Sequence, residues 1–364
     1  MEYKKENINS ILTINVANLI KNYNKLKSTN SKAEVAACVK ADAYGLGCIK
    51  ICKILLENGC NSFFVATSEE ALSLRKKFKN INIFLLNGVN DQNTCLKMIK
   101  ENIFIVINNV DQLNIIKKVF ILNKKKIKCA IHIDIGMNRL GFSFEQFKEI
   151  YDGIKNYLNI KLVMSHLTSS EIKNSSHNLK QLNRFKKVID NFFFLKSIKY
   201  SLSNSNGAFL GKKYCFNMIR AGGFLFGLDL SSENKGNPVL SLKTKIIQIN
   251  SISAGNGIGY GSNFITKKKS VIATLAIGYA DGLPRNYKGY ILLNNKKAPF
   301  VGNISMDLSC IDITAVPNLK VNDWVEIFGN NVSIFDFAKY SKTITYEISS
   351  KIGNRVKRVY NYNI

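Results

Sequence analysis

Long apolar segments are missing from this 364-residue sequence. Its first ten residues, MEYKKENINS, contain no apolar run of the kind found in a signal peptide. No window approaches the roughly 18 uninterrupted apolar residues that a membrane-spanning helix needs. We therefore expect a chain with neither a signal peptide nor a membrane span.

Closely spaced cysteine pairs are also absent. The eight cysteines are scattered and form no C-x-x-C pair; they are Cys38, Cys48, Cys52, Cys60, Cys95, Cys129, Cys215 and Cys310. A disulfide framework or a zinc site normally shows tighter spacing. The pattern predicts reduced thiols in a cytoplasmic protein without a metal site.

Acidic residues are few, because 25 Asp and Glu stand against 52 Lys and Arg and give a formal charge of +27. A basic stripe is typical of nucleic-acid binding, since it neutralises phosphates. Here the lysines are spread along the whole chain, with only short runs at residues 124–126 and 267–269 and no interleaved aromatic side chains. We therefore predict no specific nucleic-acid binding, which a salt-sensitive gel shift with unrelated DNA tests.

The chain does have 46% hydrophobic residues and enough length for two domains. A β-branched run at residues 11–15 leads into a helix that continues to about residue 27. Eight further strand-like runs then alternate with stretches of helical periodicity. These runs are residues 33–40, 62–68, 81–89, 103–108, 127–134, 160–167, 198–205 and 216–223. Repeated strand–helix units predict an α/β fold, and eight of them predict a closed (β/α)8 TIM-type barrel.

The composition changes after the eighth run. Residues 231–238 are polar and turn-prone, as expected of a linker. Beyond them, strand-like runs dominate and helical periodicity is weak; the runs are residues 240–252, 270–277, 290–293, 307–313 and 324–328. We expect residues 1–232 to form the barrel and residues 233–364 to form a mainly β C-terminal domain.

Polar residues follow several of the predicted barrel strands, and active sites of such barrels lie at the carboxyl ends of the strands. These residues are Lys40, Arg139, His166, Asn204, Ser205, Arg220, Gly222 and Gly223. Each alone has a simpler interpretation. A strand-end lysine is often merely solvated, a lone histidine often belongs to the core, arginines form salt bridges, and Ser-Gly turns are common. Their convergence on one face favours a catalytic site that binds an anion.

Nine motifs in this chain occur in the same order as in a known family. They are VKADAYGLG, HIDIGMNRLGF, SHLTSSE, SNSNGAF, RAGGFLFG, IGYGSNF, AIGYADGLPR, VGNISMD and YEISSKIGNRVKR. The first closely resembles the cofactor-lysine motif of alanine racemases, and the others resemble the later motifs of that family. The resemblance extends from residue 39 to residue 358. It implies a barrel followed by a β domain, and a homodimer whose active sites are shared between subunits.

The resemblance also implies a set of cofactor contacts. Lys40 would carry pyridoxal 5′-phosphate, Arg220 would face the pyridine nitrogen, and Arg139 would hydrogen-bond the phenolic oxygen. His166 would link Arg220 to a tyrosine of the partner, and Asn204 would support the pocket. The residues that would hold the cofactor phosphate are Tyr44, Ser205, Gly222 and Gly223, because hydroxyl groups and turn amides bind anions.

The implied activity is the interconversion of L-alanine and D-alanine, which supplies D-alanine for peptidoglycan. Racemisation needs one base on each face of the reacting carbon. The resemblance assigns these roles to Lys40 and to Tyr260 of the partner subunit. The residues that it places at the substrate are Arg139, Met306, Asp307 and Tyr279, the last at the entrance. An arginine at the pyridine nitrogen cannot readily donate a proton, which weakens the cofactor as an electron sink and favours racemisation over transamination.

Three positions depart from the family pattern. His132 replaces a lysine that is sometimes carbamylated to orient the motif arginine, so no carbamate is available there. Leu46 replaces a histidine of the lysine motif. Asn354 is expected to replace a phosphate-binding tyrosine of the C-terminal motif, which would weaken phosphate contact from that side.

Other functions compete with this interpretation. A related barrel racemase of broader specificity, for example toward serine, would share every motif. A barrel decarboxylase is disfavoured, because it would place an acidic group where this chain has Arg220. A non-catalytic cofactor-binding barrel would lack the second domain that carries Tyr260, Met306 and Asp307.

Overall fold

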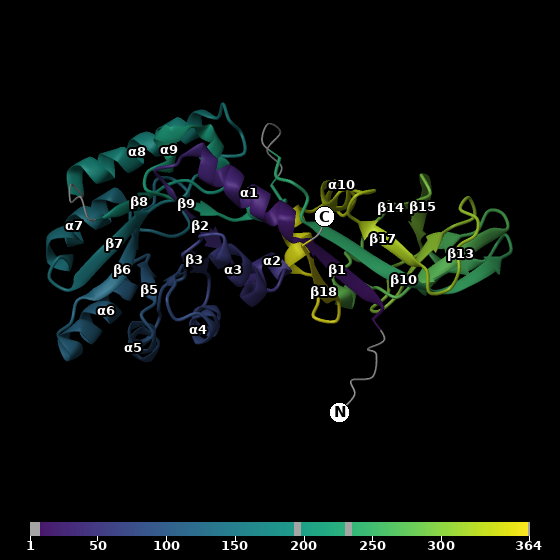
Figure 1. The fold of residues 1–364 in the computed structure, drawn as a ribbon, viewed down its shortest axis with the longest axis horizontal. Helices are drawn as coiled ribbons and strands as arrows, with labels where there is room; N and C mark the ends of the chain where they lie inside the picture. Colours follow the sequence, from purple (N-terminus) through teal and green to yellow (C-terminus); the bar gives the residue numbers. More distant parts are fainter. Residues whose placement is uncertain (1–7, 193–197, 230–234, 363–364) are drawn as a thin grey trace.

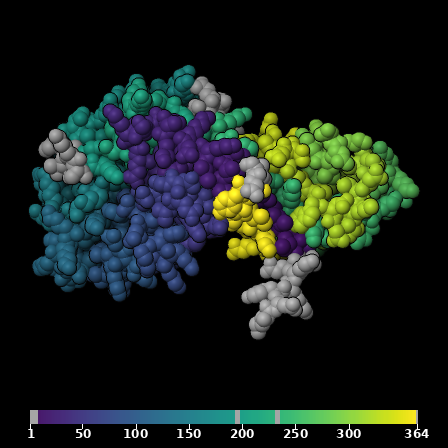
Figure 2. All heavy atoms as spheres, viewed as in Figure 1, coloured from purple at the N-terminus to yellow at the C-terminus, as the bar shows by residue number. Residues whose placement is uncertain are grey.

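The structure, a computed structural model, describes residues 8–192, 198–229 and 235–362. It has two parts that lie end to end (Figure 1). The purple-to-teal part is an α/β barrel, and the green-to-yellow part is built mainly of β-strands. The space-filling view shows that the β-rich part projects from one end of the barrel, so the molecule is elongated (Figure 2).

Eight parallel strands form the barrel in the order β8-β7-β6-β5-β4-β3-β2-β9. Their bounds are β2 Glu34–Cys38, β3 Ser62–Val65, β4 Asn82–Leu85, β5 Phe104–Ile107, β6 Ile127–His132, β7 Leu158–Met164, β8 Lys199–Ser201 and β9 Met218–Ala221. At the β8–β9 seam, the amide of Arg220 donates to the carbonyl of Ser203 at 3.0 Å. The predicted (β/α)8 barrel is thus confirmed, and each predicted run contains or overlaps one of these strands.

Helices connect the strands and cover the outside of the barrel (Figure 1). Their bounds are α1 Val16–Thr29, α2 Lys40–Gly45, α3 Cys48–Glu57, α4 Ser68–Lys77, α5 Gln92–Lys100, α6 Val110–Asn123, α7 Phe144–Ile154, α8 Ser176–Phe192 and α9 Lys212–Cys215. Several begin at side chains that cap the first turn; Thr67 and Glu70 form a reciprocal capping box at α4. Short 3-10 turns follow β8 and β9, at Asn206–Leu210 (η1) and Gly223–Phe226 (η2).

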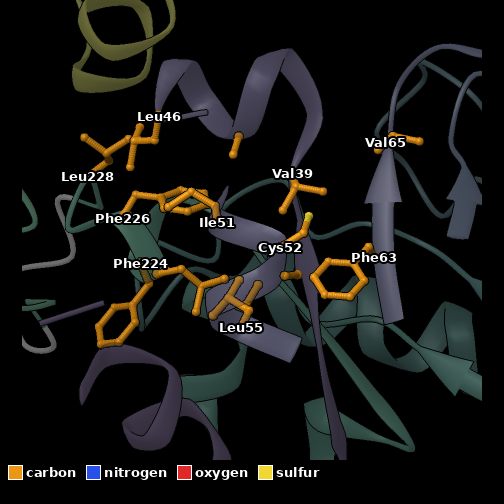
Figure 3. Packing of buried hydrophobic residues seen from close by; sticks show 14 of the residues in the cluster. Val39, Leu46, Ile51, Cys52, Leu55, Phe63, Val65, Phe224, Phe226 and Leu228 are labelled. Atoms are coloured by element: carbon orange, nitrogen blue, oxygen red, sulfur yellow. The ribbon is translucent and has the colours of Figure 1, made fainter. Parts of the chain in front are cut away.

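Alternate residues of the strands build two separate cores. Phe63 and Val65 of β3 pack outward into the larger core that includes the helices, whereas Phe64 belongs to a smaller core made only of strand residues. Within this barrel interior, the Phe64 ring stacks on that of Phe84 with centroids 4.5 Å apart. The larger core continues beneath the segment that carries Lys40, where Val39, Ile51 and Phe226 gather (Figure 3).

A second sheet forms the β-rich part, with strand order β14-β15-β16-β13-β10-β1-β18 and β17 paired to β10. The bounds are β1 Ser10–Asn15, β10 Leu240–Ile252, β13 Ser270–Leu275, β14 Tyr290–Leu293, β15 Lys296–Val301, β16 Ser309–Asp312, β17 Trp324–Phe328 and β18 Lys357–Asn361. A small hairpin pairs β11 (Gly257–Ile258) with β12 (Phe264–Ile265), and two 3-10 turns occur at Tyr260–Ser262 (η3) and Tyr279–Asp281 (η4). Helices α10 (Ile334–Tyr340) and α11 (Thr345–Ser350) complete this part, which is mainly β as expected.

One detail differs from the division expected from the sequence. Strand β1 lies in the second sheet, antiparallel to β10 and parallel to β18, although residues 1–232 are expected to form the barrel. Long-range pairing fixes this position, for example that of Leu12 with Leu242 and Arg358. The expected boundary between residues 232 and 233, and part of the linker at 231–238, lie outside the described residues.

The three described segments contain no helix that is long and apolar enough to cross a membrane.

Candidate functional site

A cavity of about 470 Å³ opens at the carboxyl ends of the barrel strands. It is lined by the eight residues that the sequence placed at the barrel mouth and by Tyr44, which the family resemblance added. The nine are Lys40, Tyr44, Arg139, His166, Asn204, Ser205, Arg220, Gly222 and Gly223. They come from five strand ends that are far apart in sequence. The walls thus combine two arginines and a lysine with hydroxyl groups and turn amides, a set of groups suited to a phosphorylated ligand.

Lys40 enters the cavity from an unusual turn of the backbone. Residues 41–44 all have left-handed backbone angles, with φ between 52° and 58°. Such angles cost L-residues roughly 1–2 kcal/mol each, so surrounding contacts must hold the turn. The amide of Ala41 donates to Oε1 of Glu70 at 2.6 Å, and the amide of Cys48 donates to Oδ1 of Asp42 at 2.7 Å.

The segments after β8 and β9 form a cradle for an anion. The Ser205 hydroxyl accepts from the amide of Gly222 at 2.8 Å. A Cβ on Gly222 would lie 2.5 Å from the Tyr44 hydroxyl, so only glycine fits this close approach. Burial raises the pKa of Tyr44, so its phenol stays protonated and can donate to a phosphate oxygen. These residues fit the phosphate of pyridoxal phosphate.

Tyr346, which the sequence analysis missed, also belongs to the cradle. It lines the cavity, its ring centroid lies 5.9 Å from that of Tyr44, and its hydroxyl would lie 2.4 Å from a Cβ on Gly223. The expected role of Asn354 is wrong, because Asn354 lines a different hollow beside Asp307 and Arg355. The last motif, YEISSKIGNRVKR, therefore does bring a tyrosine to the cradle, and its first residue was the available signal.

Arg220 is fixed inside the barrel by backbone oxygens. It is 3% exposed, and its Nη1 donates to the carbonyl and hydroxyl of Ser201 at 2.9 and 2.6 Å. Its Nη2 donates to the carbonyl of Ser165 and lies 3.3 Å from Nδ1 of His166. Burial lowers the pKa of Arg220 to about 10, so the guanidinium keeps its charge at neutral pH.

His166 is neutral in this arrangement. Burial and the charge of Arg220 lower the pKa of His166 well below its ordinary value. Because arginine can only donate, Nδ1 of His166 must accept from it, and the ring proton must sit on Nε2. His166 can therefore offer an N–H at its other nitrogen.

His132 lines the same cavity as Arg139 and Arg220. Its Nδ1 lies 2.8 Å from Oδ1 of Asn108, whose amide nitrogen donates to the carbonyl of Leu86 at 3.0 Å. Asn108 therefore presents its oxygen, and His132 carries its proton on Nδ1 and a lone pair on Nε2. Burial, with Arg220 as the next cause, lowers the pKa of His132 to about 4.

The loops that carry Arg139 and Asn204 are shaped by side-chain hydrogen bonds. Oδ1 of Asp134 accepts from the amides of Gly136 and Met137, both at 2.9 Å, and so forms the turn that leads to Arg139. Oδ1 of Asn204 accepts from the Ser170 hydroxyl at 2.8 Å and from the Gly207 amide at 2.9 Å. Asn204 therefore positions the loop that presents Ser205.

The other predicted site residues gather on the β-rich part and do not line the cavity within the described chain. Tyr260, Tyr279 and Met306 are 75%, 42% and 54% exposed. The amide of Tyr279 donates to the carbonyl of Ser305 at 3.0 Å, so Tyr279 and Met306 lie together. Asp307 next to them accepts from Nη1 of Arg355 at 2.8 Å.

The fold and the cavity together define a barrel enzyme that holds a pyridoxal phosphate cofactor. Comparison with known proteins narrows this class. Residues 14–230 match the family described as "Alanine racemase, N-terminal domain", and residues 239–360 match "Alanine racemase, C-terminal domain". The chain therefore belongs to the alanine racemase family, whose members are isomerases.

Named relatives agree with this assignment. The chain is 42% identical to the alanine racemase of Rickettsia bellii over 90% of its own length and 81% of the relative's. It is 39% identical to the alanine racemase of Rickettsia canadensis, over 96% of its own length and 98% of the relative's. Among solved structures, the alanine racemase of Bartonella henselae "with covalently bound pyridoxal phosphate" superposes with a TM-score of 0.91 at 34% identity, covering 97% and 99% of the two chains.

Proposed function

We propose that the cavity is the active site of a racemase that interconverts L-alanine and D-alanine with Lys40 and Tyr260 as its two bases. The observation that carries this proposal is the position of the two groups. Lys40 lines the cavity, whereas Tyr260 lies exposed on the β-rich part of the same chain and outside that cavity. A second subunit would supply Tyr260, so the enzyme would act as a homodimer.

Each chain contributes a different set of residues to the shared site. Tyr44, Ser205, Gly222, Gly223 and Tyr346 would hold the cofactor phosphate, and Lys40 would bind the cofactor covalently. Pyridoxal phosphate supplies the electron sink that makes the Cα proton of the bound amino acid removable. Lys40 takes or returns this proton on one face, and Tyr260 of the partner subunit does so on the other.

His166 prepares the tyrosine for this role. Since Nδ1 of His166 accepts from Arg220, the proton on Nε2 can be donated to the oxygen of Tyr260 from the partner subunit. A hydrogen bond from a neutral donor favours the deprotonated tyrosine without a proton being lost to the histidine. Arg220 itself keeps its proton, so it would not protonate a cofactor ring nitrogen held beside it.

Substrate selection would use both subunits. Arg139 would bind the phenolic oxygen of the cofactor and approach the substrate, while Met306 and Asp307 from the partner would lie at the substrate carboxylate. The ion pair between Arg355 and Asp307 offsets the negative charge that would otherwise repel this carboxylate. Tyr279 would border the entrance, and a narrow entrance favours a small amino acid.

The product and the compartment are part of the proposal. The enzyme would supply D-alanine for peptidoglycan, and it would work in the cytoplasm. The eight cysteines support a reducing compartment, since all of them are free.

Purified protein incubated with L-alanine tests the activity. We expect D-alanine to form, faster with added pyridoxal phosphate if the preparation has lost cofactor, and more slowly from L-serine or L-lysine. Borohydride reduction should attach the cofactor to the peptide that contains Lys40. Attachment to another lysine would refute the assignment of Lys40, and a preference for serine would refute the assignment of alanine.

A further inference from the structure

Asp229 is a buried carboxyl group that the mechanism above does not use. It is 2% exposed, and neither of its oxygens has a hydrogen-bond partner. Within the described ranges, five buried side-chain polar atoms lack a partner, and two of them belong to this one residue. A buried unpaired carboxylate is costly, so the group must be neutral or must serve a ligand.

Asp229 faces the phosphate cradle. It lines the same cavity as Ser205 and Gly223, and its Oδ1 would lie only 2.2 Å from a Cβ on Gly223. The chain folds back after η2, because the amide of Leu228 donates to the carbonyl of Gly223 at 2.9 Å. The hydroxyl of Thr345 at the start of α11 holds the carbonyl of Leu228. Asp229 and Tyr346 are thereby kept over the same glycine.

The surroundings of Asp229 favour its neutral form. Among the described residues, the titratable groups that face it are Tyr44 of α2, Tyr346 of α11 and Glu171 from the segment after β7, and none of these three is a cation. Burial raises the pKa of Asp229 to about 7. The Phe224 amide and the Ser205 hydroxyl lie near the carboxyl and act in the opposite direction, although neither makes a hydrogen bond of normal geometry to it. A phosphate bound in the cradle adds negative charge and favours the neutral acid further.

We propose that Asp229 binds the cofactor phosphate as a neutral acid, by donating its carboxyl proton to a phosphate oxygen, and so makes cofactor retention depend on pH. This inference rests on the proposed placement of the phosphate at Ser205, Gly222 and Gly223. A donor O–H beside a phosphate forms a short charge-assisted hydrogen bond, whereas an ionised carboxylate there would repel it. At a pH high enough to ionise Asp229 in the apoenzyme, cofactor binding must therefore take up one proton from solvent.

The first test measures the dissociation constant of pyridoxal phosphate for the apoenzyme between pH 6 and pH 9. For the unmodified protein we expect this dissociation constant to rise by up to about tenfold per pH unit above pH 7. Asp229→Asn should not show this rise, because an asparagine side chain can donate a hydrogen bond to the phosphate but does not ionise. Glu171→Gln is the matched control: it removes a neighbouring negative charge but leaves Asp229 able to ionise, so it should keep the steep pH dependence with its onset at a lower pH. Pyridoxal, which lacks the phosphate, should bind Asp229→Asn and the unmodified protein alike.

The second measurement needs no variant. In protein labelled with ¹³C at the aspartate carboxyl carbons, one resonance of the apoenzyme should titrate near pH 7 and stay in the neutral form at pH 8 once pyridoxal phosphate is bound. If the cofactor binds with the same pH dependence in Asp229→Asn and in the unmodified protein, or if every carboxyl of the loaded enzyme is ionised at pH 8, Asp229 has no such role. A protein that binds pyridoxal phosphate weakly or not at all would instead contradict the proposed function.

Discussion

At the scale of single residues, the active site depends on two neutral histidines beside a buried arginine. Arg220 donates to oxygens of Ser201 and Ser165, and its charge helps to keep His132 and His166 unprotonated. The arginine therefore fixes both the geometry and the protonation of its neighbours. These contacts lead to two predictions.

Arg220→Glu should lower racemisation and raise the ratio of transamination to racemisation. A carboxylic acid at this position can protonate the ring nitrogen and strengthen the electron sink, which an arginine does not do. We expect a loss of racemase activity on the order of 10²-fold, as for other removed electrostatic contacts. Arg220→Lys keeps a positive charge and is the control, with thermal unfolding measured for both. An unchanged ratio in Arg220→Glu would mean that the arginine is only structural.

The buried histidines should make the fold sensitive to acid. The pKa of His132 is lowered from 6.5 to about 4, so between these values the unfolded chain binds a proton that the folded chain does not. Stability contributed by His132 is complete above pH 6.5 and is lost as the pH falls toward 4, by roughly 3 kcal/mol. Denaturant unfolding at pH 7 and pH 5 should show roughly 2 kcal/mol of this loss, and His132→Gln should reduce it. His177→Gln, at an exposed histidine, should leave the loss unchanged.

At the scale of secondary-structure elements, the C-terminal segment holds the turn that carries Lys40 in place. Arg358 in β18 donates to the carbonyl of Gly45 from Nε at 3.1 Å and from Nη2 at 2.9 Å. The same guanidinium donates to the carbonyl of Ile352 at 2.6 Å, and Tyr360 donates to that of Leu46 at 2.6 Å. Ser349 at the end of α11 binds the carbonyl of Tyr44. A segment more than 300 residues away thus stabilises the left-handed turn.

Arg358→Ala should weaken cofactor binding as well as stability. Removing the guanidinium leaves the carbonyl of Gly45 unpaired and loosens the turn that presents Lys40 and Tyr44. We expect a loss of about 2–4 kcal/mol in the free energy of unfolding and a raised dissociation constant for pyridoxal phosphate. Tyr360→Phe removes one hydrogen bond and should have a smaller effect on both. If cofactor affinity survives in Arg358→Ala, β18 does not control the turn.

At the scale of the whole molecule, the two parts of one chain carry complementary halves of the proposed site. The barrel carries the cavity, and the β-rich part carries the exposed group of Tyr260, Tyr279, Met306 and Asp307. A closed two-fold dimer would place each group at the partner's cavity. The arrangement can be tested by mixing inactive proteins.

Lys40→Ala and Tyr260→Phe should each be nearly inactive, because losing one acid–base group costs about 10²–10⁴-fold. In a dimer of the two variants, one site receives both lesions, and the other receives native Lys40 and native Tyr260 from different chains. Mixing under conditions that exchange subunits should therefore restore up to one working site per mixed dimer. Differently tagged chains confirm the exchange. No recovery despite confirmed exchange would contradict the site shared between subunits.

Local sequence patterns are sufficient to predict the barrel and nearly all of its mouth. Strand periodicity is a local property, and residues at strand ends must converge once the barrel closes, so the positions of Lys40, Arg139 and Arg220 at the cavity follow from the sequence. Tertiary contacts are needed to place β1 in the second sheet, to bring Tyr346 rather than Asn354 to the cradle, and to bury Asp229 beside Gly223. These three features depend on contacts between segments that are distant in sequence, or on a chain reversal such as the one after η2. Such contacts have no periodic pattern in the sequence, because they form only when the folded chain packs these segments together.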